Sequence, residues 1–424
     1  MGVLADVLFG FFGLGVLLSI AWLCSTARRR VDWPLVAIGV ALQIGFAIVV
    51  LMVPGGRDVF DALGHGFVKL LEFNREGSIF IFGDLARTDR FGFIFAFQVL
   101  PTIVFFAALM GVLYHLGVMQ FVVKIMSGAI TRVMRVSGAE TTSVCASIFI
   151  GQTEAPLTIK PYLSRMTNSE LLTVMVGGMA HIAGGVLAAY IALLGGDDPE
   201  LQLYYAKHLL AASIMAAPAT LVVAKLLMPE TQEPLTRGKV RIEVEKTTVN
   251  VIDAAAGGAG EGMRLALNIG AMLLAFIALI AMINAPLTWL GEVTGLADLI
   301  GQPTNLAALL GYLLSPIAWV IGVPWQDAVT IGGLIGQKIV INEFVAYLDL
   351  ARIQDTLTDK GRLIATYALC GFANFASIAI QIGGIGGLAP DRRSDLARFG
   401  MRAVLGGTLA TLMTATIAGV ITSF

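Results

Sequence analysis

The chain has 424 residues, of which 57% are hydrophobic and only 13% charged, and its formal net charge is −1. Its mean hydropathy is +0.83. These values exclude an ordinary soluble protein, and the near-zero charge excludes the polybasic surface of a nucleic-acid-binding protein. The sequence therefore predicts an all-α polytopic membrane protein.

Apolar runs long enough to cross a bilayer, which takes about 20 residues, recur along the whole chain. We predict eight spans, at 3–24, 34–53, 93–118, 169–194, 203–228, 263–290, 362–388 and 401–423. The stretch 58–73 predicts an amphipathic helix along the outer face, because its apolar residues recur at helical spacing. These residues are Phe60, Leu63, Phe67, Leu70 and Leu71.

Two further stretches, 139–163 and 325–348, are apolar on both sides of a polar centre. Each is too interrupted to cross the bilayer once, so we expect each to form a re-entrant helical hairpin.

Basic residues in short loops give the orientation, because cytoplasmic loops carry an excess of Lys and Arg. The basic loop residues are Arg28, Arg29 and Arg30, then Lys124, Arg132 and Arg135, and finally Arg392, Arg393 and Arg398. The acidic loop 195–200 falls on the opposite side. This topology predicts a multi-pass protein of the cell inner membrane with both termini in the periplasm.

The segments 137–163 and 323–350 share a pattern that predicts an internal repeat. Each has an acidic residue near its start and a polar cluster that ends in a glutamate; these residues are Glu140 and Glu154, then Asp327 and Glu343. Each segment is followed by a span with an interrupted middle, at 177–185 and at 371–384. An odd number of predicted spans separates the two units, so we expect them to be inverted relative to one another.

Polar side chains at membrane depth are tolerated only where they are buried in protein or line a watery cavity. In one interpretation Gln152 and Thr153 join neighbouring helices by hydrogen bonds and Glu154 caps a helix end. Two clusters at matching repeat positions favour a second interpretation, in which both hairpin tips and both interrupted spans meet around a small-molecule site.

The motifs G-Q-T-E (151–154), N-E-F-V-A (342–346) and F-A-N-F-x-S (372–377) occur in this order and at separations that resemble the concentrative nucleoside transporter family. The resemblance covers nearly the whole chain, and the length and eight predicted spans are similar to bacterial members. It implies a homotrimer in which a scaffold holds a moving transport domain that works as an elevator.

The resemblance also implies roles for single residues. Those facing the nucleobase would be Gln152, Thr153, Glu154 and Val186, and those holding the ribose would be Glu343, Asn374 and Ser377, with Phe372 alongside. An amide and a carboxylate match the paired donors and acceptors of a nucleobase edge, and vicinal hydroxyls suit a carboxylate and an Asn.

The implied domains follow the predicted elements. Scaffold helices with the amphipathic helix occupy 1–118, the first transport half 119–228, a cytoplasmic linker 229–262, a further scaffold span 263–300 and the second transport half 301–424. Each half contains one hairpin and two spans.

The coupling cation is H⁺ or Na⁺, and no other cofactor is expected. The family's sodium is held by backbone carbonyls with an Asn and a Ser or Thr side chain, whereas the matching positions here are Ser147 and His181. Imidazole is a poor ligand for Na⁺ but protonates near pH 6.5, so proton coupling is favoured. Two alternatives stay open: sodium bound through carbonyls alone, and proton transfer by Glu343 with His181 only packing.

The sequence contains no H-E-x-x-H or G-x-S-x-G motif, so we do not expect an enzyme. The chain is instead interpreted as a secondary active symporter that imports nucleosides and contacts only membrane lipid and its own copies. The alternative is a non-transporting nucleoside-recognition protein of the gate type. Such proteins carry one half of this repeat, and the presence of two halves favours transport.

Overall fold

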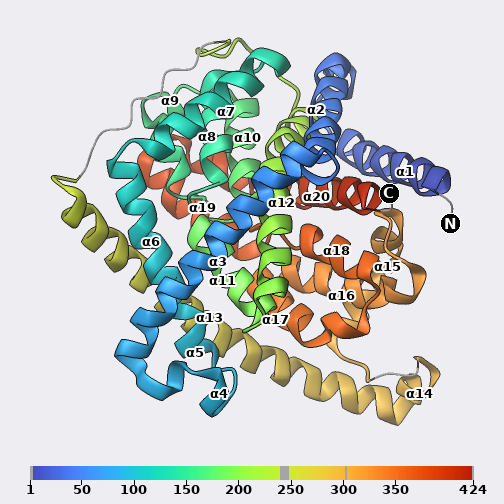
Figure 1. Cartoon of the computed structure of the whole chain (residues 1–424). Coiled ribbons are helices and arrows are strands. Elements are labelled where there is room, and N and C mark those ends of the chain that lie inside the picture. The colour runs from blue at the N-terminus through green and yellow to red at the C-terminus, as the bar shows by residue number, and fades with distance from the viewer. Residues whose placement is uncertain (1–2, 239–247, 301–302, 423–424) are drawn as a thin grey trace.

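The computed structural model describes residues 3–238, 248–300 and 303–422 (Figure 1). Within them all regular structure is helical except one isolated β-bridge between Ser137 and Arg237. The N-terminal helices are α1 (Val3–Leu23), α2 (Trp33–Leu51), α3 (Pro54–Phe82), α4 (Thr88–Phe91), α5 (Phe95–Gln98), α6 (Leu100–His115) and α7 (Val118–Met134), with 3-10 turns η1 (Arg28–Arg30) and η2 (Gly83–Ala86).

The middle of the chain forms α8 (Gly138–Ser147), η3 (Ala155–Ile159), α9 (Lys160–Leu163), α10 (Asn168–Ala180), α11 (Gly184–Gly195) and α12 (Pro199–Leu227). The C-terminal part forms α13 (Val251–Thr294), α14 (Leu296–Ile300), α15 (Leu306–Val320), α16 (Trp325–Val340), α17 (Glu343–Ile353), η4 (Gln354–Thr356), α18 (Asp359–Ala368), α19 (Phe375–Leu388), η5 (Pro390–Arg392) and α20 (Arg393–Ile421).

The predicted class, an all-α polytopic membrane protein, is confirmed. Seven helical segments in the described residues are long and apolar enough to cross a membrane: Leu4–Leu23, Trp33–Leu51, Phe95–His115, Asn168–Gly195, Pro199–Leu227, Val251–Thr294 and Pro390–Ile421. They overlap seven of the eight predicted spans. The remaining one, 362–388, is divided into α18 and α19, and neither of these is long enough to cross alone.

The two longest helices without a counterpart among the predicted elements are α7 and α15. The stretch with the basic residues Lys124 and Arg132, predicted to be a loop, contains α7, and the stretch between the predicted span 263–290 and the second hairpin contains α15. Helix α15 has only 15 residues with Pro316 inside it, and it meets α16 at a bend of 117°. A helix this short does not pass a test for a full span, which is why a search for 20-residue apolar runs overlooks it.

The amphipathic helix expected at 58–73 is part of the longer α3. Its expected apolar face is mostly buried, with Phe60 and Leu71 inside and Phe67 and Leu70 packed against the core, whereas Leu63 is 47% exposed. Helix α3 packs against α12 and α6, so this face contacts protein.

The expected linker 229–262 is shorter than predicted, because α13 already begins at Val251; its part 239–247 lies outside the described residues. The Asn250 side chain caps this helix by accepting from the Asp253 backbone N–H at 2.9 Å. The sequence AAAGGAGEG (254–262) suggests a flexible linker. Tertiary packing overrides that weak helix propensity, because α13 lies along α6 here.

The contact between α6 and α13 depends on glycines. A Cβ on Gly258 would lie 2.5 Å from the Ala107 carbonyl oxygen, and one on Gly262 would lie 2.8 Å from the Val104 Cα. Small residues let the two backbones approach closely, as in other membrane helix pairs. The pair α6–α13 is therefore a tightly packed unit, visible along one side of the molecule (Figure 1).

Helices α1 and α2 pack against α12 and α20. The contact is close, since a Cβ on Gly10 would lie 3.5 Å from the Val420 Cβ. Lys360 of α18 also forms an ion pair of 3.0 Å with Asp6 of α1. This packing joins α1 and α2 to the bundle that contains both interrupted spans, and the division into scaffold and transport halves stays a prediction.

The two interrupted spans meet at their breaks. Helix α10 ends at Ala180 and α11 starts at Gly184, while α18 ends at Ala368 and α19 starts at Phe375. Gly371, at φ 156°, lies so close to the first break that a Cβ there would be 2.8 Å from the Met179 carbonyl oxygen. Both interruptions predicted at 177–185 and 371–384 are thus present, and they contact each other in the core.

Candidate functional site

The first hairpin begins with helix α8, whose N-terminus is capped by two hydrogen bonds. The Ser137 N–H donates to the Glu140 carboxylate at 3.0 Å, and the Thr236 hydroxyl accepts from the Ala139 N–H at 3.1 Å. Helix α8 ends at Ser147, and η3 packs back against it. The non-helical residues 151–154 between them are the G-Q-T-E motif, which leaves its side chains free to point away from a helix axis.

The second hairpin turns at Ile341 and Asn342. The Asn342 side chain caps α17 by accepting from the Val345 N–H at 3.0 Å. Glu343 is therefore the first residue of α17, where a carboxylate is favoured by the positive end of the helix dipole. Helix α17 packs back against α16.

Glu343 is buried and hydrogen-bonded at both carboxylate oxygens. Its Oε2 accepts from Asn374 Nδ2 at 2.9 Å, and its Oε1 accepts from the Tyr190 hydroxyl at 3.1 Å. Asn374 lies in the break before α19, and Tyr190 lies in α11 of the first half. The carboxylate of the second hairpin thus joins both interrupted spans.

Gln152 makes the corresponding connection from the first hairpin. Its Nε2 donates to the Ser377 hydroxyl at 3.1 Å, and its Oε1 accepts from Gln381 Nε2 at 3.0 Å. Gln381 also donates to the Met175 carbonyl at 2.9 Å. Gln152 is only 8% exposed, so its hydrogen bonds are shielded from bulk water.

A single hydrogen-bonded chain therefore runs through the centre of the molecule. It passes from Tyr190 to Glu343 and Asn374, then through the Ser377 N–H, which donates to Asn374 Oδ1 at 2.9 Å, and on to Gln152. The structure brings together four of the predicted site residues in this way: Gln152, Glu343, Asn374 and Ser377.

The other four predicted residues lie around this chain without joining it. Thr153 donates to the neighbouring Glu154 carboxylate at 2.8 Å, and Glu154 itself is exposed. Val186 is buried in α11 and Phe372 is half-buried in the second break. Thr153 is partly exposed and Glu154 is exposed, so the side chains of both hairpin-tip residues are accessible to a ligand.

Sequence reasoning missed Tyr190 and Gln381, although Tyr190 donates a hydrogen bond to Glu343 and Gln381 donates one to Gln152. Gln381 is a single amide in the apolar run IAIQIGG, and a polar residue in such a run is a signal that could have found it. Tyr190 in LAAYIALL gives no such signal, because an aromatic residue in a span is usually packing.

Some polar atoms at this centre have no partner in the described part of the chain. They include Gln381 Oε1, an acceptor, and Asn342 Nδ2, a donor. Leaving a buried polar group unsatisfied costs about 1–3 kcal/mol. Such open donors and acceptors are the groups with which a polar solute would bind.

Ser147 and His181 lie one helical turn beyond a close contact between α8 and α10, where a Cβ on Gly177 would be 2.9 Å from Val144 Cγ2. The Ser147 hydroxyl donates to the Ser143 carbonyl at 3.0 Å. His181 Nδ1 lies 2.7 Å from the Gly177 carbonyl oxygen. Because that oxygen can only accept, Nδ1 carries the proton and Nε2 is the basic nitrogen; among the described residues Nε2 has no hydrogen-bond partner.

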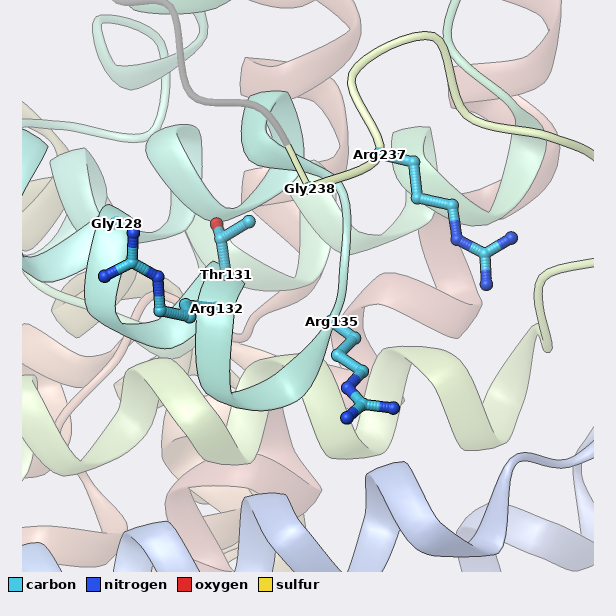
Figure 2. A pocket seen from close by; sticks show the side chains of 6 residues that line it. All are labelled: Gly128, Thr131, Arg132, Arg135, Arg237 and Gly238. Atoms are coloured by element: carbon cyan, nitrogen blue, oxygen red, sulfur yellow. The ribbon is translucent and has the colours of Figure 1, made fainter.

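A separate hollow of about 550 Å³ lies between the end of α7 and the segment that ends at Gly238. It is lined by Gly128, Thr131, Arg132, Arg135, Arg237 and Gly238, and the Arg132 side chain points away from those of Arg135 and Arg237 (Figure 2). None of the predicted nucleoside-contacting residues lines it. This hollow is therefore distinct from the central polar chain.

Residues 208–419 match the family described as "Na+ dependent nucleoside transporter C-terminus", and residues 12–85 match its N-terminal counterpart. Residues 96–197 match the gate family described as "Nucleoside recognition". The nucleoside permease NupC of Helicobacter pylori is 40% identical, with 97% of each chain covered. The chain belongs to the concentrative nucleoside transporter family.

A further relative and two solved structures agree with this family. The mouse sodium/nucleoside cotransporter 1 is 39% identical over 98% of this chain and 64% of its own length. The solved structure of CNTnw in an inward-facing, substrate-bound state is 44% identical, with a TM-score of 0.88 and coverage of 99% of this chain and 98% of that one. An outward-facing structure of a CNTnw variant gives a TM-score of 0.89 at 44% identity, covering 98% of each chain.

Proposed function

We propose that this member of the concentrative nucleoside transporter family is a secondary active symporter that imports nucleosides across the inner membrane. The observation that carries the proposal is the buried chain from Tyr190 to Gln152, which links both hairpins to both interrupted spans. Without a solute these side chains form hydrogen bonds with one another. A bound nucleoside can exchange these hydrogen bonds for its own, so that binding leaves no buried polar group without a partner.

The two ends of the chain suit the two parts of a nucleoside. Glu343 and Asn374 supply a carboxylate and an amide for vicinal ribose hydroxyls, with Ser377 one turn along and Phe372 beside them. The tip residues Gln152, Thr153 and Glu154 offer donors and acceptors for a base edge, and the buried Val186 of α11 offers an apolar contact. These roles agree with the names of two relatives, the nucleoside permease of Helicobacter pylori and the mouse sodium/nucleoside cotransporter 1.

For the coupling cation we favour H⁺. His181 is buried, its Nδ1–H is engaged with Gly177, and its basic Nε2 is open. A proton there converts Nε2 into a donor and adds a positive charge next to the end of α10, where the helix dipole is negative. The family is described as sodium-dependent, and sodium bound by backbone carbonyls is the alternative that the experiment below separates.

For the transport movement we propose an elevator in a homotrimer, with α6 and α13 as the stationary part. These two helices pack on each other along glycines, and α13 leaves most of its apolar surface uncovered within one chain. The relatives' structures were captured in inward-facing, outward-facing and intermediate states, which supports alternating access.

The test is uptake of radiolabelled uridine, cytidine and adenosine into proteoliposomes. A pH gradient without sodium should drive accumulation, and a sodium gradient at uniform pH should not. His181→Ser should lose the dependence on the pH gradient while still exchanging nucleoside across the membrane. Accumulation driven only by sodium, or an unchanged pH dependence in His181→Ser, would overturn proton coupling through this residue.

The same experiment addresses the gate-type alternative, which the match of residues 96–197 specifically recommends. A nucleoside-recognition protein without transport binds nucleoside but gives no accumulation under either gradient. Matches to both the N- and C-terminal transporter families extend over regions outside that match, and this favours transport.

A further inference from the structure

Lys338 is a buried lysine that the proposed binding and coupling steps do not use. It lies on α16, the first arm of the second hairpin, and is fully buried at 0% exposure. Its Nζ donates to the Ala368 carbonyl at 2.8 Å and to the Thr411 hydroxyl at 2.9 Å. In the described part of the chain it forms no ion pair.

A second buried lysine, Lys225, differs from Lys338 because it has a counter-charge. Lys225 of α12 is paired with Glu140 at 2.8 Å and lies 3.4 Å from Glu230. Burying a charge without a counter-charge is costly, so such groups persist where they serve a purpose. Lys338, by contrast, forms no ion pair with any carboxylate of the described residues.

The position of Lys338 is informative because Ala368 is the last residue of α18, where the second interrupted span breaks. Terminal carbonyls of a helix lack intrahelical partners and carry the negative end of its dipole. Here both arms of the second hairpin supply donors to them: Lys338 of α16 to Ala368, and the Tyr347 hydroxyl of α17 to Thr366 at 2.8 Å. The hairpin is thereby fastened to the break that carries Asn374.

The first half lacks this arrangement. At the end of α10 the Gly177 carbonyl accepts from His181, and no described residue donates to the carbonyls of Gly178, Met179 or Ala180. No lysine or arginine of the described chain reaches that end. The two breaks therefore differ in one respect: the second has a covalently attached cation at its terminal carbonyls, and the first has open carbonyls beside Ser147 and His181.

We propose that Lys338 is a positioning residue for nucleoside binding, a built-in cation that holds the second hairpin to the break of α18 and α19. The first hairpin would depend on an exchangeable cation at the corresponding place. Through this contact Lys338 sets the distance between Glu343 and Asn374, the two groups assigned to ribose. The inference rests on the proposed function for that assignment. It predicts that only the first half responds to the coupling cation.

The test compares Lys338→Gln, which keeps a donor but removes the charge, and Lys338→Met with the exposed hairpin lysine variant Lys160→Gln. Nucleoside affinity is measured by calorimetry per mole of folded, monodisperse protein. We expect at least a tenfold loss of affinity in both Lys338 variants and none in Lys160→Gln. Wild-type affinity in Lys338→Gln would show that the charge is dispensable and would overturn the proposal.

A second measurement needs no nucleoside and so separates this inference from the proposed function. Hydrogen–deuterium exchange of the unliganded protein should increase in Lys338→Gln at 341–353 and 369–375, while 148–159 of the first hairpin stays unchanged. Unchanged exchange at both second-half segments, or an equal increase in all three, contradicts the proposal.

Chemical rescue distinguishes the cation from mere filling of space. Lys338→Ala lacks a three-carbon amine, so propylammonium present during purification should restore nucleoside affinity, and 1-propanol of similar volume should not. Equal rescue by both compounds would show that volume alone is needed and would also overturn the proposal.

Discussion

Glu343 shows how a single residue can connect the two halves of this transporter. Its carboxylate accepts from Asn374 in its own half and from Tyr190 in the other half. The aromatic rings of Phe344 and Tyr347 pack on Tyr190, with centroid distances of 4.7 and 4.4 Å. This apolar surrounding keeps water away from the carboxylate and strengthens its hydrogen bonds.

Glu343→Ala should nearly abolish nucleoside uptake. The change removes the proposed ribose acceptor and also leaves the Tyr190 hydroxyl and the Asn374 amide without their partner, each at a cost of about 1–3 kcal/mol. The measurement is nucleoside affinity of the purified, monodisperse variant together with uptake in proteoliposomes. Asp349→Ala, a carboxylate on the same helix that pairs with Arg352 at 3.3 Å, is the matched control and should bind normally. Wild-type affinity in Glu343→Ala would remove Glu343 from the ribose site.

Gln152→Asn tests the other end of the polar chain. A side chain shorter by one methylene cannot reach both Ser377 and Gln381 at the present distances of 3.1 and 3.0 Å. We expect the ranking among uridine, cytidine and adenosine to change, while the penalty for 2′-deoxynucleosides stays as in the wild type. Competition of each nucleoside against labelled uridine measures both quantities. An equal loss for all bases would contradict a role in base selection.

At the scale of elements, the close packing of α6 on α13 depends on which side of α13 each glycine occupies. Gly258 faces α6, where a Cβ would lie 2.5 Å from the Ala107 carbonyl oxygen and 2.9 Å from the Ala108 Cα. Gly260 of the same helix has nothing within 4 Å of such a Cβ. Backbone atoms cannot move aside as a flexible side chain can, so a methyl group at Gly258 must separate the helices.

Gly258→Ala should therefore lower the thermal unfolding temperature, whereas Gly260→Ala should leave it unchanged or raise it slightly. Alanine favours a helix over glycine by roughly 1 kcal/mol, so propensity alone predicts a gain at both positions. The two variants are compared in the same detergent by thermal unfolding. An equal gain in both would show that the α6–α13 contact tolerates a wider spacing than the structure has.

At the scale of the whole molecule, the packing divides the helices into two groups. Helices α1 and α2 pack with α12 and α20, and α6 packs with α13. Helix α11 packs on α12 of the first group and on α6 of the second, and α3 also contacts both. If the proposed elevator moves the first group past α6 and α13, contacts within a group persist during transport and contacts between the groups change.

Two cysteine pairs test this division. A Cβ on Gly10 would lie 3.5 Å from the Val420 Cβ, and one on Gly185 would lie 3.7 Å from the Phe106 Cβ, and both distances suit a disulfide. We expect the oxidised Gly10→Cys, Val420→Cys pair to transport normally and the oxidised Gly185→Cys, Phe106→Cys pair to stop transport until it is reduced. Exposed Cys24 is replaced in both, since Cys145 and Cys370 are buried. Normal uptake by the second pair when oxidised would contradict movement at this boundary.

The sequence alone determined the class, most of the spans, the interrupted spans and the family. These properties depend on composition, on runs of apolar residues and on short motifs, all of which are local along the chain. Gln152 and Glu343 also stand out by themselves as polar side chains in apolar runs, whereas Asn374 and Ser377 were expected only from the resemblance to the family's motifs.

Only the tertiary structure decided which of these residues touch and which helices belong together. Tyr190 joins Glu343 across 153 positions of the chain, and Lys338 reaches Ala368 across 30. The glycines at 257–262 suggest a linker in sequence, yet they form a helix because α6 packs on two of them. Such contacts depend on how close two backbones come in space, and no local pattern of residue types records that distance.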